Sequence, residues 1–368
     1  MMSVLRRVDF IFLLLLLAMA CIGLFTLYAA VHQGDTSLWW KQCVFWAVGL
    51  SCFFILCFIP TRFIAMMSWP FYLLALFFLA LVPFVGDIHM GARRWLDLGP
   101  VNMQPSEMMK WALVLMFAHW FASRDAGNWR SLLIALILAA IPAGLIVIQP
   151  DLGTALVILF TGSAIILAAG LPWGWLLATL GTSPFLVYVL WLNMHAYQQR
   201  RVLSFFDPHN DPLGAGYHVI QSTIAIGSGG LFGKGYMEGT QARLHFLPEQ
   251  HTDFIFAVLA EEGGLLAVGV LLLCYTLLVA RILFIARRAR TRFASMLCVG
   301  VASIFVLYIG INIGMVSGAL PVVGVPLPFV SYGGSALLTM VAALGLVMRV
   351  SIESTDKIPW QRPSNPIA

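Results

Sequence analysis

The feature that most constrains the fold of this chain is a succession of apolar runs, each long enough to cross a lipid bilayer. A spanning helix needs about 20 mostly apolar residues, because the hydrocarbon core is about 30 Å thick and a helix rises about 1.5 Å per residue. Ten such runs lie near residues 9–30, 41–59, 69–86, 107–122, 131–148, 153–170, 173–193, 253–280, 295–317 and 333–350. They predict an all-α, polytopic membrane protein with ten transmembrane helices.

These runs take up almost the whole chain. Of its residues, 61% are hydrophobic and only 10% are charged, whereas charged residues make up about a quarter of an ordinary soluble domain. The one long connection, residues 195–252, lies between the seventh and eighth runs. We therefore expect a single membrane domain over residues 1–368, with one large extracytoplasmic loop and no soluble domain.

Lys and Arg residues set the expected orientation. If the N-terminus is cytoplasmic, the inner loops and tails contain most of the 21 Lys and Arg, including a cluster from Arg281 to Arg292. The positive-inside rule then places both termini in the cytoplasm. The net charge of +5 fits this topology and contact with anionic lipid, so it does not indicate nucleic-acid binding.

Neither the cysteines nor the histidines indicate metal or disulfide chemistry. All six cysteines lie inside apolar runs without metal-site spacing, which is typical of small buried apolar groups. The eight histidines form no HExxH or paired-ligand pattern, so a dedicated zinc site is not expected. Binding of a hard cation by outer carboxylates stays open.

Four of the runs open with a polar motif, and the count of crossings places all four openings on the outer side. The motifs are Gln104-Pro105-Ser106-Glu107, Gln149-Pro150-Asp151, His251-Thr252-Asp253 and Ser331-Tyr332-Gly333-Gly334. Carboxylates are unfavourable beside hydrocarbon, and the unpaired N–H groups of helix N-termini attract anions. The openings therefore predict an outer-face site for a polar or charged substrate.

The acidic side chains in these openings have two interpretations each. Glu107 and Lys110 are three residues apart and can pair on one helix face, either to bind substrate or to fix helix packing as a salt bridge. Asp151 and Asp253 each stand where a helix begins, so each can act at a site or serve as a helix cap. Both interpretations remain open for all of them.

Two features of the outer side are harder to place. Glu261 and Glu262 lie two turns deeper than Asp253, and at about 100° per residue at most one of them faces the same cavity. In the long loop, an amphipathic stretch at residues 217–226 precedes a glycine run at residues 227–235. The run matches no nucleotide-binding motif, and we expect flexible backbone near the membrane surface.

Basic residues also gather on the outer side. Arg93 and Arg94 precede the first polar opening, where guanidinium groups suit bidentate phosphate contact or act as snorkelling anchors. Arg200 and Arg201 lie in the long loop.

Taken together, the motifs resemble the SEDS family of bacterial peptidoglycan polymerases. The matching stretches are residues 91–96, 104–107 with Lys110, 149–154, 248–249 with 251–257, and 326–334. Residues 214–218, 226–230, 233–235 and 320–326 resemble the cell-elongation branch of the family rather than its cell-division branch. The resemblance covers essentially the full chain.

This resemblance implies an inverting glycosyltransferase that polymerises lipid II, an undecaprenyl-pyrophosphate-linked disaccharide pentapeptide, into β-1,4 glycan strands during cell elongation. It places the reaction at the periplasmic face of the bacterial cytoplasmic (inner) membrane. The family's essential carboxylate matches Asp253, which we expect to be the general base. The residues expected to bind the substrate or its pyrophosphate are Arg93, Arg94, Glu107, Lys110, Asp151, Arg200, Arg201, Glu261 and Ser331. A divalent cation (Mg²⁺ or Mn²⁺) held by Glu107 or Asp151 would assist the leaving group.

The resemblance also implies partners: the growing glycan chain, membrane lipid, and a class B penicillin-binding protein transpeptidase, penicillin-binding protein 2, within the rod complex. The eighth and ninth helices and the long loop are the expected docking region. Two rival functions fit the same helices, namely a flippase or transporter of lipid-linked precursor and a non-catalytic scaffold for a partner synthase. Transport predicts polar groups along a route through the bilayer, and only Glu261 and Glu262 suggest one.

Overall fold

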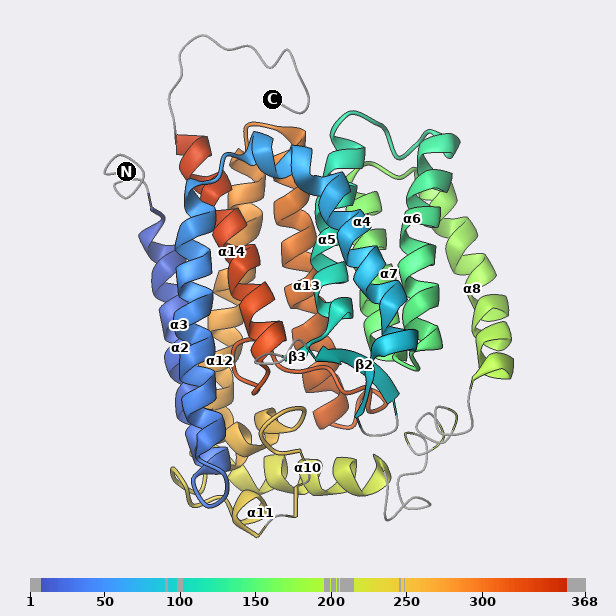
Figure 1. Ribbon diagram of the computed structural model, residues 1–368. Helices are drawn as coiled ribbons and strands as arrows, with labels where there is room; N and C mark the ends of the chain where they lie inside the picture. Colours follow the sequence, from blue (N-terminus) through green and yellow to red (C-terminus); the bar gives the residue numbers. More distant parts are fainter. Residues whose placement is uncertain are drawn as a thin grey trace.

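In the described part of the chain, ten long helices run side by side and form the body of the protein (Figure 1). The structure is a computed structural model that describes residues 8–355 except 90–91, 98–101, 195–198, 200–202, 204, 206–214, 245 and 248. The helices are α2 (Phe10–Val31), α3 (Ser37–Phe58), α4 (Thr61–Val85), α5 (Pro105–Ala122), α6 (Trp129–Ile148), α7 (Leu152–Ala168), α8 (Trp173–Asn193), α12 (Ile255–Arg288), α13 (Arg292–Val316) and α14 (Gly334–Thr355). Each apolar run thus coincides with one helix.

Seven of these helices, within the described residues, are long and apolar enough to cross a membrane: α2, α3, α4, α6, α12, α13 and α14. α7 is apolar but has 17 residues. α5 contains Glu107, Lys110 and His119, which make it less apolar than its neighbours. The prediction of a helical membrane fold is therefore confirmed.

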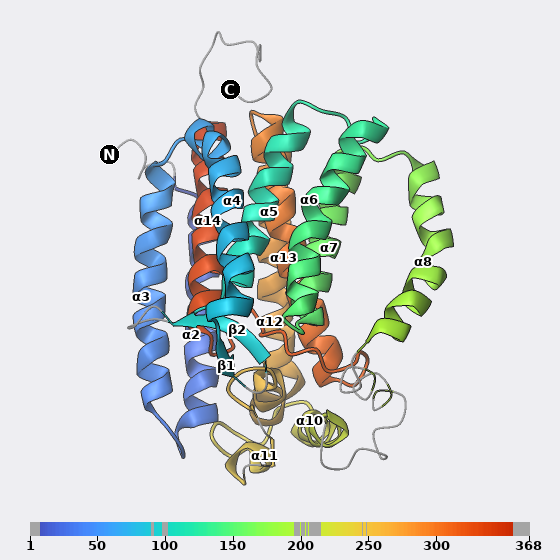
Figure 2. The ribbon, with the colours of Figure 1, turned by 45° about the vertical axis from the view of Figure 1, so that its right-hand side comes forward.

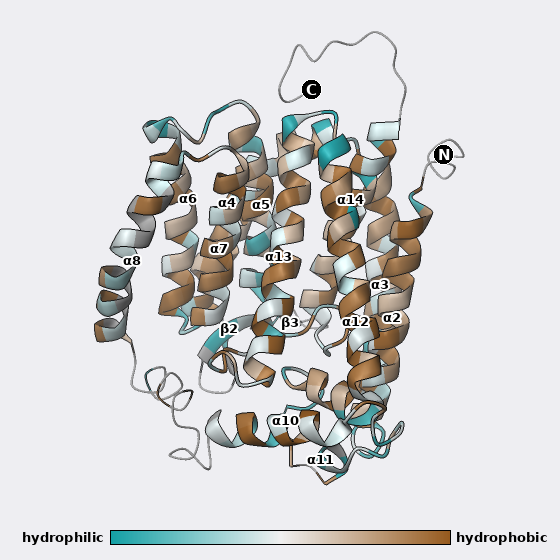
Figure 3. Ribbon diagram, turned by 180° about the vertical axis from the view of Figure 1, so that it is seen from behind, coloured by the Kyte–Doolittle hydropathy of each residue, from teal (hydrophilic) through white to brown (hydrophobic). Residues whose placement is uncertain are grey.

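The four polar openings lie at the same end of the helix bundle. α5, α7, α12 and α14 all begin at the lower end in Figure 1, whereas α2 begins and α14 ends at the upper end. The helix α10 (Ala215–Gly229), which contains the amphipathic stretch, lies across the lower end beside the short α11 (Thr240–Arg243) (Figure 2). Apolar residues dominate the middle of the helices, and hydrophilic residues gather toward both ends (Figure 3).

One loop of this all-α fold contains strands that the sequence did not predict. Between α4 and α5 the chain forms an antiparallel sheet of three strands, β1 (Asp87–His89), β2 (Ala92–Asp97) and β3 (Asn102–Met103), in the order β1-β2-β3. A non-helical segment at the edge of an apolar bundle must pair its backbone N–H and C=O groups, and it does so here with itself. This pairing also positions Arg93 and Arg94, which lie on β2.

α5 is the central helix of the bundle. It packs against α4, α7 and α13, and all of its residues except Met108 and His119 are buried. A helix that is buried on every side must pair any charge it carries, because a lone charge in a dry interior is unfavourable. Glu107 and Lys110 therefore lie inside the protein and not at its lipid surface.

α12 is interrupted at Gly264, and the glycine run of the long loop binds backbone groups that the interruption leaves unpaired. Gly264 has a left-handed backbone (φ 63°, ψ −165°), a conformation that is essentially restricted to glycine. The N–H groups of Lys234 and Gly235 donate to the carbonyls of Glu261 and Glu262 at 3.0 and 3.1 Å. The expectation of flexible backbone in the glycine run is wrong, because these bonds fasten the run to α12.

We predict that Gly264→Ala destabilises the protein. A Cβ at this position would collide with the backbone of Leu231 and Gly233, and neither can move without breaking the loop contacts. The strained backbone adds about 1–3 kcal/mol. Gly269→Ala is the matched control, because a Cβ there meets nothing within 4 Å and alanine is the better helix former. Thermal unfolding in detergent should show a lower Tm for Gly264→Ala alone; equal Tm values for the two variants would contradict this account.

Candidate active site

Asp253 lies in a tight turn, residues 249–254, directly before α12. The structural interpretation of Asp253 as the helix cap is wrong, because the N-cap residue of α12 is Phe254, which makes no side-chain cap hydrogen bond. The carboxylate of Asp253 is half-buried and faces the backbone of Gly324, where an added Cβ would lie 3.2 Å from Oδ2. The turn thus presents a carboxylate at the polar end of the bundle.

Three successive carbonyl groups of this Asp253 turn accept hydrogen bonds from two other segments, the loop before α14 and the helix α13. The His251 carbonyl accepts from the N–H of Tyr332 at 2.8 Å. The Thr252 carbonyl accepts from Ser331 Oγ at 2.6 Å, and the Asp253 carbonyl accepts from Asn312 Nδ2 at 2.9 Å. Each bond uses a backbone carbonyl, and together they hold the turn in place with the Asp253 carboxylate facing Gly324.

Ser331 connects the Asp253 turn to the loop before α14. Its buried hydroxyl accepts from the N–H of Leu327 at 2.7 Å as well as donating to Thr252. Gln42 of α3 fastens the same segment, because its Nε2 donates to the Ser331 carbonyl at 3.1 Å. The third and fourth polar openings are therefore one connected structure, and the substrate-binding role expected for Ser331 stays a prediction.

Tyr332 lies at the edge of the same cluster. Its ring centroid is 6.1 Å from that of His251. Burial raises the pKa of Tyr332 above its ordinary value, and the negative charge of Asp35 raises it further. The phenol therefore stays protonated at neutral pH and keeps its ability to donate a hydrogen bond.

Glu107 and Lys110 form the predicted pair. Lys110 Nζ lies 2.6 Å from Glu107 Oε1, and the two residues are only 1% and 4% exposed. Tyr308 of α13 completes the group: its hydroxyl donates to Glu107 Oε1 at 3.4 Å, and Lys110 Nζ lies 4.5 Å from the centre of its ring. Glu107 Oε2 has no partner among the described residues. Whether the pair binds substrate or fixes packing stays open at this point.

The second polar opening is joined to the sheet. Asp151 caps α7, which is one of its two interpretations, because its Oδ1 accepts from the N–H of Thr154 at 3.2 Å and its Oδ2 from the Thr154 hydroxyl at 2.9 Å. Arg94 donates to the carbonyls of Gln149 and Pro150. Arg93 points elsewhere, with its Nη1 donating to the Pro83 carbonyl at 3.1 Å.

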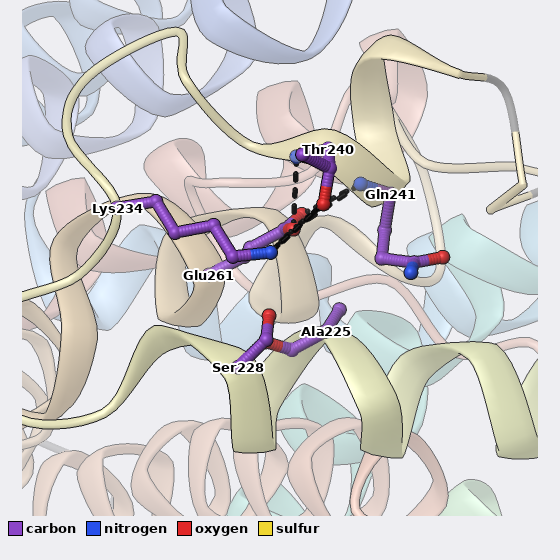
Figure 4. Close-up of polar contacts among 6 residues, drawn as sticks. All are labelled: Ala225, Ser228, Lys234, Thr240, Gln241 and Glu261. Atoms are coloured by element: carbon purple, nitrogen blue, oxygen red, sulfur yellow. Dashed lines mark hydrogen bonds and ion pairs between the residues drawn. The ribbon is translucent and has the colours of Figure 1, made fainter.

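Glu261 holds α11 in place (Figure 4). It is fully buried, and its Oε1 accepts from Lys234 Nζ at 2.6 Å, from the Thr240 N–H at 2.9 Å and from the Gln241 N–H at 3.2 Å. Below this cluster, the Ser228 hydroxyl donates to a carbonyl of its own helix, α10. These contacts account for a carboxylate buried this far inside the bundle without a bound substrate. The role of Glu261 in substrate binding stays a prediction.

The residues do not fit a divalent cation at Glu107 or Asp151. Glu107 is paired with Lys110, and both oxygens of Asp151 accept from Thr154. Within the described residues, no group of three or more His, Cys, Asp or Glu side chains is arranged to hold a metal ion. Two other predicted site residues, Arg200 and Arg201, lie outside the described residues.

Sequence reasoning missed three polar residues of this site. Asn312 and Tyr308 lie inside the run at 295–317, and Gln42 opens the run at 41–59. A signal existed, because polar side chains within spanning helices tend to be functional. It was not decisive without the partners that these residues contact.

An apolar cavity of about 280 Å³ lies between α3, α4, α5 and α14. Met108 and Trp111 of α5 line it together with Leu56, Phe63 and Ala343. These α5 residues directly follow Glu107 and Lys110 in the chain, so the charged pair and the apolar cavity occupy adjacent faces of the same helix.

Comparisons with known proteins identify relatives along nearly the full chain. The model of the FtsW/RodA/SpoVE family, described as cell cycle proteins, matches residues 6–356. Peptidoglycan glycosyltransferase MrdB of Escherichia coli (strain K12) is 45% identical over 347 residues, which cover 94% of this chain and 93% of that protein. Stage V sporulation protein E of Bacillus subtilis (strain 168) is 34% identical over 360 residues, covering 93% of this chain and 96% of that protein.

Comparisons with solved structures identify the same family of relatives. The rod shape determining protein RodA of Thermus thermophilus is 32% identical and superposes with a TM-score of 0.73 over 95% of this chain and 98% of that chain. A chain from a peptidoglycan synthase complex is 36% identical, with a TM-score of 0.83 over 95% of this chain and 98% of its own length. These matches confirm the resemblance to the SEDS family drawn from the motifs, and the chain belongs to the FtsW/RodA/SpoVE family of cell cycle proteins.

Proposed function

We propose that this chain is a peptidoglycan glycosyltransferase of the RodA type, which polymerises lipid II into β-1,4-linked glycan strands during cell elongation. The relative from Escherichia coli carries the name peptidoglycan glycosyltransferase. The observation that carries the proposal is the Asp253 turn, in which three carbonyls are bound and the carboxylate faces Gly324 at the polar end of the bundle. That arrangement suits a general base.

The proposed topology has all ten helices crossing the cytoplasmic membrane, with both termini in the cytoplasm and the Asp253 turn at the periplasmic face. Three observations support it. α2 begins and α14 ends at the same end of the bundle. Arg287 and Arg288 close α12 at that end, as the positive-inside rule expects of a cytoplasmic edge. The polar openings lie at the other end, where a carbohydrate headgroup can reach them.

The proposed reaction joins two sugars with inversion. A 4-hydroxyl oxygen attacks the anomeric carbon, the bond from that carbon to the pyrophosphate oxygen breaks, and the hydroxyl proton passes to the Asp253 carboxylate. The departing pyrophosphate carries away the electron pair and is stabilised by positive potential. The N-termini of α5 and α7, which lie at the same end of the bundle, can supply that potential together with Lys110 on α5 and Arg94 on β2.

The apolar cavity beside Trp111 is the proposed site for the part of a substrate's isoprenoid tail that lies next to the pyrophosphate. Apolar residues line it throughout apart from Thr339, and it adjoins the helix that carries Glu107 and Lys110. A tail in this cavity therefore places its pyrophosphate near the charged pair. This explains why a glycosyltransferase consists almost entirely of membrane helices.

A class B penicillin-binding protein transpeptidase is the proposed partner, with penicillin-binding protein 2 as its specific form. A groove of about 410 Å³ between α12 and α13 supports this proposal, and Leu272, Thr276, Val279, Val306 and Gly310 line it. The small residue Gly310 permits close approach of a partner helix. The chain of the synthase complex, in which polymerization and crosslinking are coordinated, has the same fold.

The two rival functions rest on weaker observations. The transporter rested on Glu261 and Glu262 as polar groups deep in the bilayer, and Glu261 is engaged by Lys234, Thr240 and Gln241. The scaffold rested on carboxylates acting as helix caps. Asp151 is such a cap, but Asp253 is not.

We predict that Asp253→Asn abolishes polymerisation while the protein stays folded. Removing a general base costs about 10²–10⁴-fold in rate, and asparagine keeps the shape of the side chain. The measurement is product length from labelled lipid II, with purified enzyme and its transpeptidase partner. Asp125→Asn at the opposite end is the control, because its carboxylate is 81% exposed. Polymer formed by Asp253→Asn at the wild-type rate would remove Asp253 from the reaction.

The Glu107–Lys110 pair can be tested with single and double variants. We predict that Lys110→Met alone lowers Tm strongly, because an uncompensated buried carboxylate costs about 3–5 kcal/mol. The double variant Glu107→Gln, Lys110→Met should recover the Tm, since no buried charge is left. If the pair binds substrate, the double variant stays inactive on lipid II; recovered polymerisation would show that the pair serves packing alone.

A further inference from the structure

We propose that Asn312 is a positioning residue for Asp253, an inference that rests on the proposed function. Asn312 lies in α13 and is fully buried. Its Nδ2 donates to the Asp253 carbonyl at 2.9 Å and to the Val325 carbonyl at 2.8 Å. A single amide thus joins the Asp253 turn to the loop between α13 and α14.

The chemistry of its partners determines how this amide is oriented. Both partners are carbonyl oxygens, which only accept hydrogen bonds, so the nitrogen of the amide must face them. The other atom, Asn312 Oδ1, is buried and has no partner among the described residues. A buried acceptor without a partner is unfavourable, and an apolar residue would avoid it. The two donated bonds therefore account for an asparagine at this position.

The two acceptors are the residues that bring the carboxylate and the loop together. Asp253 carries the carboxylate, and its carbonyl is one acceptor. The other acceptor, Val325, directly follows Gly324, the residue that this carboxylate faces. A Cβ added at Gly324 would lie 3.2 Å from Asp253 Oδ2. Gly324 has a left-handed φ of 78°. Glycine tolerates this conformation, and because it has no side chain its backbone can lie close to the Asp253 carboxylate. By binding both segments, Asn312 sets the separation between the carboxylate and Gly324.

The same face of α13 also contacts the charged pair. Tyr308 lies four residues before Asn312, and residues i and i+4 share one helix face. Tyr308 contacts Glu107 and Lys110, and Asn312 contacts the Asp253 turn. One rigid helix therefore holds the proposed base in register with the proposed pyrophosphate site. A misplacement of about 1 Å between such groups can cost about 10²-fold in rate.

The test compares variants of Asn312 in the full-length enzyme with its transpeptidase partner, using labelled lipid II. Asn312→Leu keeps the branched shape of the side chain and removes both donors. We expect kcat per folded enzyme to fall by about 10²-fold, with KM for lipid II unchanged within about threefold. Asn312→Gln keeps the donors but moves them by one methylene, so it should fold and show an intermediate kcat.

Tyr72→Phe is the matched control. It also removes a buried donor to a backbone carbonyl, here that of Leu138 at 2.7 Å, between α4 and α6 and outside the site. It should lower Tm without lowering kcat per folded enzyme. A second readout is the acidic limb of the kcat–pH profile, which a displaced carboxylate shifts and a loss of stability does not.

The outcomes separate this inference from the function beneath it. The positioning role alone would be overturned if Asn312→Leu showed wild-type kcat and an unchanged acidic limb while Asp253→Asn was inactive. If the leucine variant does not fold, Asn312→Gln serves as the test in its place. Polymerisation by Asp253→Asn would overturn the assignment of the base and the positioning role together. Reduced kcat and a shifted limb beside an unaffected Tyr72→Phe would support the proposal.

Discussion

The site depends on pairing backbone carbonyls where the chain leaves its helices at the edge of an apolar bundle. The carbonyls of His251, Thr252 and Asp253 have no helical partners, because they precede α12. An unpaired backbone group costs several kcal/mol in an environment without water. Tyr332, Ser331 and Asn312 supply the missing donors from two other segments, so the requirement to satisfy the backbone also defines where the Asp253 carboxylate lies.

The same constraint explains the long loop. The break of α12 at Gly264 leaves the carbonyls of Glu261 and Glu262 without helical donors, and the N–H groups of the glycine run bind them. Beyond the break, the Leu265 N–H donates to the Gly230 carbonyl at 2.9 Å. The loop is therefore part of the hydrogen-bonding pattern of α12, and α10 and α11 are fixed across the polar end of the bundle.

Charge follows a similar logic inside the bundle. Glu107 and Lys110 lie on a helix that is buried on all sides, and they satisfy each other together with Tyr308. α13 contacts this pair through Tyr308 and the Asp253 turn through Asn312. A polymerase needs its base and its leaving-group site at a constant separation, and a single rigid helix between them meets that need. The apolar cavity beside α5 adds room for a lipid tail.

Local spacing in the sequence was enough to predict the ten helical runs, the gathering of four polar openings at one end and the ion pair of Glu107 with Lys110, and to offer the cap as one of two interpretations of Asp151. These features involve residues within a few positions of each other, or periodicities that a bilayer imposes on every spanning helix. Only the tertiary structure decided that the Asp253 turn is not a cap, that Glu261 holds α11, and that Asn312 and Ser331 bind the turn. Their partners are 59 and 79 residues away along the chain, and a donor in one apolar run carries no local sign of which distant carbonyl it will meet.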